Sequence, residues 1–211
     1  MLSKIKEKFL SKLKNEQGSI MLYTIIFMIF FLPFSIWVGV QIPIRYQQTY
    51  EIRQNTHNTA DSMISRIDQT ALSSGLIRVD PIEAYEVGDS MTKVAYKLDD
   101  DYQPSGGGVL REEIPFYFHN LNGLYEIDSA FVEEDGAYTM PKEPGVHAFV
   151  LNGIPEGAKI HFKGVKTPVE KTSVIVHSAI PIEDGGVFGS RIIIQRTGIS
   201  EVEFNLGGND D

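Results

Sequence analysis

The stretch GSIMLYTIIFMIFFLPFSIWVGVQIPIR, residues 18–45, decides how this chain of 211 residues is organised. From Ser19 to Ile44 it contains no charged residue. A helix needs roughly 20 apolar residues, at about 1.5 Å each, to cross a bilayer core about 30 Å thick. Because a soluble core helix rarely stays uncharged for so long, the run predicts a transmembrane helix over residues 18–44, with the lipid bilayer around it.

A cleaved secretory signal is the main alternative for such a run. It would have an apolar region of about 7 to 15 residues followed by small residues of the A-x-A kind. Here the run is longer and ends in WVGVQIPIR, where no such site is present. Pro33 and Pro43 interrupt the run, but in lipid a proline kinks a helix rather than ending it. We therefore expect a retained anchor.

Residues 1–17 form a basic tail that predicts the orientation of this anchor. They contain five lysines and two glutamates, a net charge of +3, and lysines in a short flank favour retention in the cytoplasm. Subtracting +3 from the −9 of the whole chain leaves −12 on residues 18–211, which makes binding to nucleic acid unexpected. The apolar residues of the tail lie near helical spacing, so the tail is either a helix on the inner membrane face or a solvated leader.

The helical pattern continues after Arg45. Side chains of one stripe follow one another at intervals of three or four residues, as on one face of a helix, and no helix-breaking signal occurs before SSG at residues 73–75. We expect a nearly continuous helix from about Gly18 to Leu72, of which residues 45–74 form an extracytoplasmic stem. His57 on its stripe is expected to be a partly buried packing residue. The stripe comprises Tyr46, Tyr50, Arg53, His57, Ala60, Ile64, Ile67 and Ala71.

Residues 75–211 predict an extracytoplasmic head of the α+β class. Asp80, Pro81 and Glu83 are typical of a helix start. Beyond Asp99, short segments rich in Val, Ile, Phe and Tyr alternate with turn signals, which indicates an antiparallel sheet or small sandwich. The expected packing face of the helix is Ala84, Val87, Met91, Val94, Ala95 and Leu98. The expected strands cover residues 114–119, 124–132, 147–151, 159–162, 173–182, 191–196 and 200–205.

The sequence contains no recognisable catalytic or metal-binding motif. The chain has no cysteine, which excludes disulfides and thiol chemistry. The sequence has no nucleophile elbow, P-loop or dinucleotide fingerprint, and SGGG at residues 105–108 is interpreted as a linker. The acidic run at residues 99–101 lacks the spacing of a calcium loop and is interpreted as a solvated helix-to-loop junction. We expect no enzyme activity, no cofactor and no metal. The histidines, none with metal spacing, are His57, His119, His147, His161 and His177.

The segment from Asn15 to Leu72 resembles the beginning of type IV pilin-like proteins, most closely the minor pseudopilins of the tight-adherence (Tad) pilus. It has a basic leader ending at Gly18, an apolar helix with an internal Pro33 and a polar helix that carries NTAD at residues 58–61. The resemblance covers about residues 12–72. It implies cleavage by a prepilin peptidase between Gly18 and Ser19. The family's glutamate, five residues into the mature chain, is replaced here by Tyr23, so an uncut assembly factor of the same family is an alternative.

The resemblance implies a non-enzymatic, single-pass membrane component of a pilus or secretion assembly. Its partners would be other pilin-like subunits or assembly proteins. The residues themselves leave a second class open, a membrane-anchored extracytoplasmic domain that binds a ligand or acts as a sensor. A membrane-tethered hydrolase is disfavoured because no catalytic set is present.

The charge asymmetry gives a testable topology. Protease added to intact spheroplasts should degrade the acidic head, because the lysines of residues 1–17 keep the opposite end of the chain in the cytoplasm. Immunoblotting against each end of the chain measures this. A head that survives while the tail is digested would reverse the orientation.

Overall fold

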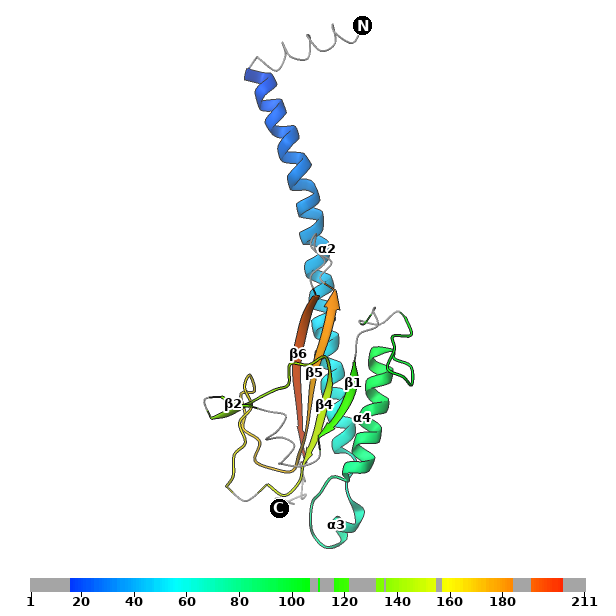
Figure 1. Ribbon diagram of the computed structural model, residues 1–211. Helices are drawn as coiled ribbons and strands as arrows, with labels where there is room; N and C mark the ends of the chain where they lie inside the picture. Colours follow the sequence, from blue (N-terminus) through cyan, green and yellow to red (C-terminus); the bar gives the residue numbers. More distant parts are fainter. Residues whose placement is uncertain are drawn as a thin grey trace, which may run out of the picture. The chain divides into compact units, whose positions relative to one another are not determined.

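The computed structural model describes residues 16–106, 110, 116–121, 132–134, 136–154, 157–183 and 191–202. The chain divides into two compact units, Met1–Gln47 and Gln48–Asp211. Three expectations fall wholly or mainly outside the described residues, namely the form of the basic tail, the strand over 124–132 and the linker at 105–108. The elements are α2 (Glu16–Ile64), α3 (Gln69–Ser73), α4 (Pro81–Tyr96), β1 (Tyr117–Leu121), β2 (Val132–Glu134), β3 (Ala137–Thr139), β4 (Gly145–Leu151), β5 (Ser173–Glu183) and β6 (Arg191–Glu201) (Figure 1).

The first unit contains the beginning of α2, whose large apolar side chains are exposed. Phe30, for example, is 73% exposed. The helix runs through Pro33 and Pro43 without a break, and the Thr24 hydroxyl donates to the Ile20 carbonyl oxygen at 2.9 Å, so this polar group is satisfied within the helix. Within the described residues, this is one helix long and apolar enough to cross a membrane.

The end of α2 belongs to the second unit and buries one stripe of side chains there. The buried members are Ile52, Thr56, Thr59, Ala60 and Met63. The stripe expected from the sequence is therefore wrong by about one position. Buried threonines explain the error: the hydroxyls of Thr56 and Thr59 donate to carbonyl oxygens four residues earlier, at 2.7 and 2.9 Å, so both side chains can be buried in spite of their polarity.

Helix α2 ends at Ile64, so the expected continuation to Leu72 is wrong. Ile67 instead forms an isolated antiparallel bridge with Val79, and Asp68 starts the separate helix α3. The Asp68 carboxylate accepts from the backbone N–H groups of Thr70 and Ala71 at 2.9 and 3.1 Å. An N-cap of this kind competes with continuation of the preceding helix.

The sheet is mixed, in the order β1-β4-β5-β6, beside a two-stranded hairpin of β2 and β3. The expectation of an antiparallel head holds for β4, β5 and β6 but is wrong for β1, which pairs with β4 in parallel. The strands expected over 147–151 and 173–182 are confirmed as parts of β4 and β5. Of the strand expected over 114–119, the last three residues belong to β1, and residues 114 and 115 lie outside the described part of the chain. The strand expected at 191–196 and the first two residues of that expected at 200–205 belong to the single strand β6, and residues 203–205 lie outside the described part of the chain. Residues 159–162 form only isolated bridges.

Alternation along the strands gives the sheet two different faces. Val146, Ala148 and Val174 point to the face covered by α2 and α4, in the larger hydrophobic cluster. Phe149 and Ile175 point to the other face, where a smaller cluster is built with Met140, Phe162, Val169 and Leu151. The head is therefore a helical layer on one side of the sheet, with strand β3 and irregular segments on the other.

Helix α2 lies very close to the sheet at Gly198 of β6. A Cβ atom on Gly198 would be 3.0 Å from the Thr56 carbonyl oxygen and 3.2 Å from His57 Cα. The hydroxyl oxygens of Thr56 and Ser178 lie 2.8 Å apart in a hydrogen bond, and the Ser200 hydroxyl donates to the Asp61 carboxylate. Glycine at position 198 thus allows the backbone of the helix to approach β6.

Helix α4 begins as expected, with Asp80 accepting from the backbone of Ile82 and Glu83 and with Pro81 in the first turn. Its expected packing face is right for Ala84 and Leu98, which are buried, but wrong for Val94, which is 74% exposed. The buried residues are Ala84, Tyr85, Gly88, Thr92 and Tyr96. The reason is Gly88, where an added Cβ would lie 2.6 Å from Met63 Sδ and 2.7 Å from Phe118 Cζ. Glycine has a low helix propensity, but at position 88 it lets α4 pack directly against Met63 and Phe118.

Substitution of Gly88 tests this packing. Gly88→Val should lower the free energy of unfolding by about 1–3 kcal/mol through overpacking against Met63 and Phe118. Ser90→Val places the same β-branched residue on the exposed side of the same helix and is the matched control. Denaturant unfolding of a fragment that begins at Gln48 measures both changes. Equal losses in the two variants would contradict the close contact.

Candidate functional site

Three histidines lie in register across neighbouring strands of the sheet. His119 of β1 pairs with His147 of β4, His147 pairs with His177 of β5, and His177 pairs with Thr197 of β6. The rings of His119 and His147 are stacked, with centroids 4.6 Å apart, and those of His147 and His177 are 6.4 Å apart. Because paired residues share one face of a sheet, these side chains form a row on the face opposite the helices. We call these three residues the histidine row.

Two members of the histidine row are buried, His147 at 5% and His177 at 2% exposure. The pKa of the His177 imidazole is lowered to about 4. Burial is the main cause, repulsion between His177 and His147 when both are protonated adds to it, and the Pro141 carbonyl acts in the opposite direction. Burial also lowers the pKa of His147, against the Glu143 carbonyl oxygen that lies 3.2 Å from its Nε2. Both rings are therefore neutral at pH 7.

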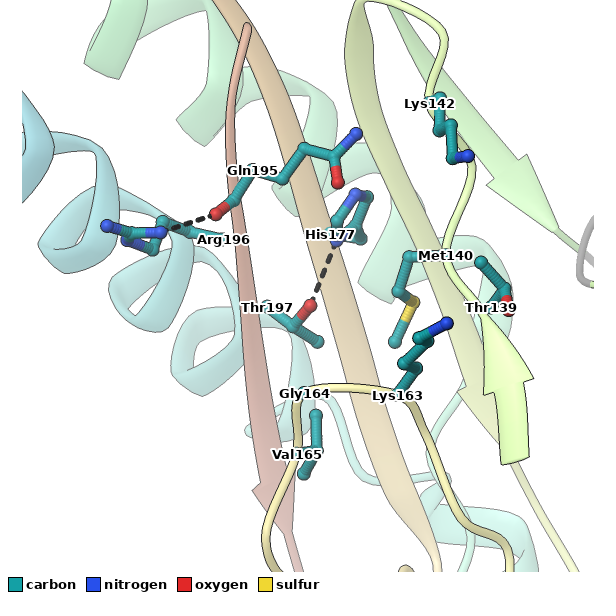
Figure 2. Close-up of a pocket in the computed structure, with 10 residues that line it drawn as sticks. All are labelled: Thr139, Met140, Lys142, Lys163, Gly164, Val165, His177, Gln195, Arg196 and Thr197. Atoms are coloured by element: carbon teal, nitrogen blue, oxygen red, sulfur yellow. Dashed lines mark hydrogen bonds between the residues drawn. The ribbon is translucent and has the colours of Figure 1, made fainter. Parts of the chain in front are cut away.

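His177 and Thr197 line a pocket of about 570 Å³ on this face (Figure 2). The segment after β3 contributes Met140 and Lys142, and the loop after Phe162 contributes Lys163. This volume falls in the range of small-molecule sites, about 300–1,000 Å³.

The remaining polar groups of the pocket come mainly from β6 and β3. Gln195 lines it, whereas the Arg196 side chain points away in Figure 2 and donates to the Gln195 carbonyl oxygen at 2.7 Å. Thr139 lies on the opposite side, and no acidic residue is among the described residues that line the pocket. The pocket is thus polar and locally basic in an acidic chain.

Two buried polar atoms that border the pocket have no hydrogen-bond partner within the described part of the chain. They are His177 Nε2 and Thr139 Oγ1. The other ring nitrogen of His177, Nδ1, lies 2.9 Å from the Thr197 hydroxyl oxygen. Because an unsatisfied buried group costs about 1–3 kcal/mol, the pocket is a place where an additional hydrogen-bonding partner would be stabilised.

The histidine row does not converge on one point, as ligands of a metal ion must. Among the described residues, no three His, Asp or Glu side chains are grouped so that they could hold a metal ion. The stacked arrangement of His119 and His147 places the rings face to face, so their ring nitrogens are not directed at a common centre.

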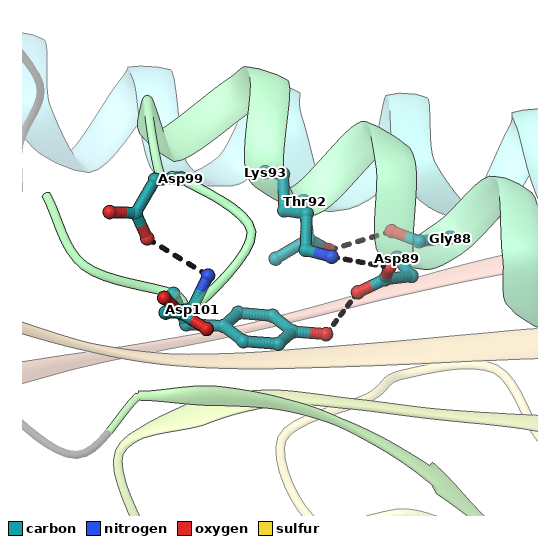
Figure 3. Close-up of polar contacts among 7 residues, drawn as sticks. Gly88, Asp89, Thr92, Lys93, Asp99 and Asp101 are labelled. Atoms are coloured by element: carbon teal, nitrogen blue, oxygen red, sulfur yellow. Dashed lines mark hydrogen bonds and ion pairs between the residues drawn. The ribbon is translucent and has the colours of Figure 1, made fainter. Parts of the chain in front are cut away.

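The acidic residues after α4 form a turn. The Asp99 carboxylate accepts from the backbone N–H groups of Asp101 and Gln103 at 3.0 and 2.8 Å, and Figure 3 shows the contact with Asp101. Helix α4 ends at Tyr96, so these residues form the helix-to-loop junction expected from the sequence. The Asp99 carboxylate therefore holds the backbone of the turn.

Tyr102, which follows this acidic run, fixes the turn to helix α4. Its hydroxyl donates to the Asp89 carboxylate, and Asp89 also pairs with Lys93 at 3.0 Å. The Lys93 ammonium lies 4.8 Å from the centre of the Tyr102 ring, within the range of a cation–π contact. Burial and the Asp89 carboxylate raise the pKa of Tyr102, so its hydroxyl keeps its proton and its hydrogen bond.

The residues that the sequence singled out are distributed widely. Gly18 and Ser19 lie in the first turns of α2, and cleavage between them stays a prediction. His57 is exposed, so its expected packing role is wrong, and His161 is exposed as well. The histidine row and the pocket were missed. The available signal was that His119, His147 and His177 each fall in an expected strand, but the register that aligns them cannot be read from the sequence.

The burial of His177 predicts a pH-dependent stability. The unfolded chain takes up this proton near the ordinary pKa of 6.5 and the folded chain only near 4, so the unfolded state binds more protons between these values. The resulting stabilisation is complete above pH 6.5, and roughly 3 kcal/mol of it is lost as the pH falls to 4. Denaturant unfolding of the Gln48–Asp211 fragment at several pH values measures the slope. His177→Gln should flatten it and His161→Gln should not.

Comparison with protein-family models, with curated proteins and with solved structures finds no match to this chain. Similarity therefore assigns neither a family nor an activity. The function has to be inferred from the apolar helix, the head packed on its end and the basic pocket.

Proposed function

We propose that the chain is a non-enzymatic, single-pass membrane protein that serves as a pilin-like, pseudopilin-type component of a pilus or secretion assembly. The observation that carries this proposal is helix α2. One unbroken helix, Glu16–Ile64, supplies an exposed, charge-free segment and also the stripe buried in the head. The same helix can therefore serve as a membrane anchor in its first part and as a packed element of the folded head in its last part.

The exposed segment needs an apolar environment. Large apolar side chains such as Phe27, Phe30 and Phe34 are more than half exposed. Leaving such a side chain in water forfeits about 1.5–3 kcal/mol, and a helix that is apolar on all sides is typical of a membrane span. Lipid or neighbouring apolar helices supply that environment in a membrane.

The same segment allows another helix to approach closely. A Cβ atom on Gly39 would meet nothing within 4 Å, and Ser35 and Thr24 are also small. Small residues let backbones approach in lipid, where packing rather than the hydrophobic effect drives helix association. Lateral association with other pilin-like helices follows from this surface.

One segment of the resemblance to pilin-like proteins, NTAD at residues 58–61, contacts the sheet. Of the residues NTAD at 58–61, Thr59 and Ala60 are buried and Asp61 accepts the hydrogen bond of Ser200. In the proposed orientation the N-terminus is cytoplasmic and the head is extracytoplasmic, as the lysines of the tail favour. Prepilin peptidase then has access to the Gly18–Ser19 bond from the cytoplasmic side of the membrane.

The pocket beside His177 favours a second candidate from a different class. A membrane-anchored extracytoplasmic domain that binds a ligand or senses it would have the same anchor and would use this pocket. The two functions are compatible in one chain, since the pocket lies on the face of the sheet that α2 does not cover.

Processing tests the pilin-like proposal. Expression of the full chain in bacteria with and without a prepilin peptidase should give an intact mass lacking residues 1–18 only when the peptidase is present. Gly18→Leu should abolish the difference, because glycine leaves the backbone at the cut unobstructed. A chain that still begins at Met1 in peptidase-containing cells would overturn processing and leave an uncut assembly factor or an anchored ligand-binding domain.

A further inference from the structure

We propose that the pocket lined by His177 and Thr197 binds a small ligand through a carboxylate or phosphate group. This inference concerns the head alone and does not depend on the pilin-like function. It rests on the charges at the rim of the pocket, on the buried donors at its base and on its size.

The charges at the rim are positive. Lys142 and Lys163 line the pocket, and among the described residues that line it none is acidic. Residues 18–211 as a whole carry a net charge of −12, so a concave site with two ammonium groups is a local exception. A cleft lined by one sign of charge concentrates ligands of the opposite sign, and ammonium groups form strong hydrogen bonds with anions.

The buried imidazole adds a neutral donor. The Thr197 hydroxyl can donate its proton to Nδ1 of His177, 2.9 Å away, and the ring then carries its own proton on Nε2. Nε2 is buried and has no hydrogen-bond partner among the described residues, and neither has the Thr139 hydroxyl. An anionic oxygen that accepts from Nε2 satisfies a donor that the described part of the fold leaves unsatisfied, and the Thr139 hydroxyl is a second such donor on the opposite side of the pocket.

The number of charges limits the class of anion. Because His177 is held neutral, the positive charge that the described residues bring to the pocket comes from the ammonium groups of Lys142 and Lys163. That is enough for one carboxylate or phosphate but not for the run of phosphate contacts that nucleic acid requires. A pocket of about 570 Å³ is also larger than a bare inorganic ion needs, and Met140 and Val165 offer apolar surface to the carbon part of a ligand.

Binding is measured on the full chain in non-ionic detergent. Inorganic phosphate and citrate are titrated separately by calorimetry, and the ring nitrogen signals of histidine are followed by NMR. We expect saturable binding of at least one of the two anions, with a shift of the His177 signals. Lys142→Gln and Lys163→Gln should each weaken binding by about tenfold, as the loss of one charged hydrogen bond does.

Lys166→Gln is the matched control, because Lys166 is exposed in the same loop as Lys163 but does not line the pocket. Absence of saturable binding of both anions would overturn the inference. Equal weakening by Lys166→Gln would also overturn it, since the effect would then arise from overall charge. Vesicles containing phosphatidylglycerol separate a lipid headgroup from a soluble ligand, and binding to vesicles alone would overturn a small-ligand site. Failure of Gly18 processing leaves all these outcomes unchanged.

Discussion

The close contact between helix α2 and strand β6 at Gly198 determines how the head is built. With only a hydrogen atom at this position, the Thr56 carbonyl oxygen lies 3.0 Å from where a Cβ would be, and the Thr56 hydroxyl reaches Ser178 at 2.8 Å. The helix thereby covers one face of the sheet and forms hydrogen bonds with the serine hydroxyls on that face. Because that face is closed by α2 and α4, the opposite face is where β4, β5 and β6 can present polar side chains to a ligand.

The two faces of the sheet use buried polarity in different ways. On the helical face, hydroxyls of Thr56, Thr92 and Ser178 bond to nearby backbone or to one another, so these three are satisfied within the fold, whereas the Tyr96 hydroxyl of the same cluster has no hydrogen-bond partner among the described residues. On the other face, His177 is bonded at one nitrogen and not at the other. A satisfied network rigidifies a core, whereas an unsatisfied donor beside a pocket is a feature of recognition sites.

Local signals in the sequence predicted the features that depend on local physics. The uncharged run at residues 19–44, the Asp80 cap with Pro81 and the strands around His147 and His177 could all be identified, because composition, capping and β-propensity act over a few residues. The break after Ile64 was missed because the Asp68 cap was not recognised. The parallel pairing of β1 and the alignment of His119, His147 and His177 could not be read, because strand order and register are set by contacts between distant segments.

At Gly88 and Gly198 a neighbouring element occupies the space that a side chain would need. A divergent relative with the same packing could therefore accept few residues other than glycine at either position. The same holds for the spacing between each glycine and its partner, Met63 for one and Thr56 for the other. Overall identity can decay while such steric pairs persist. These pairs, together with an imidazole in each of three adjacent strands, make a physical fingerprint by which distant members of a lineage can be sought.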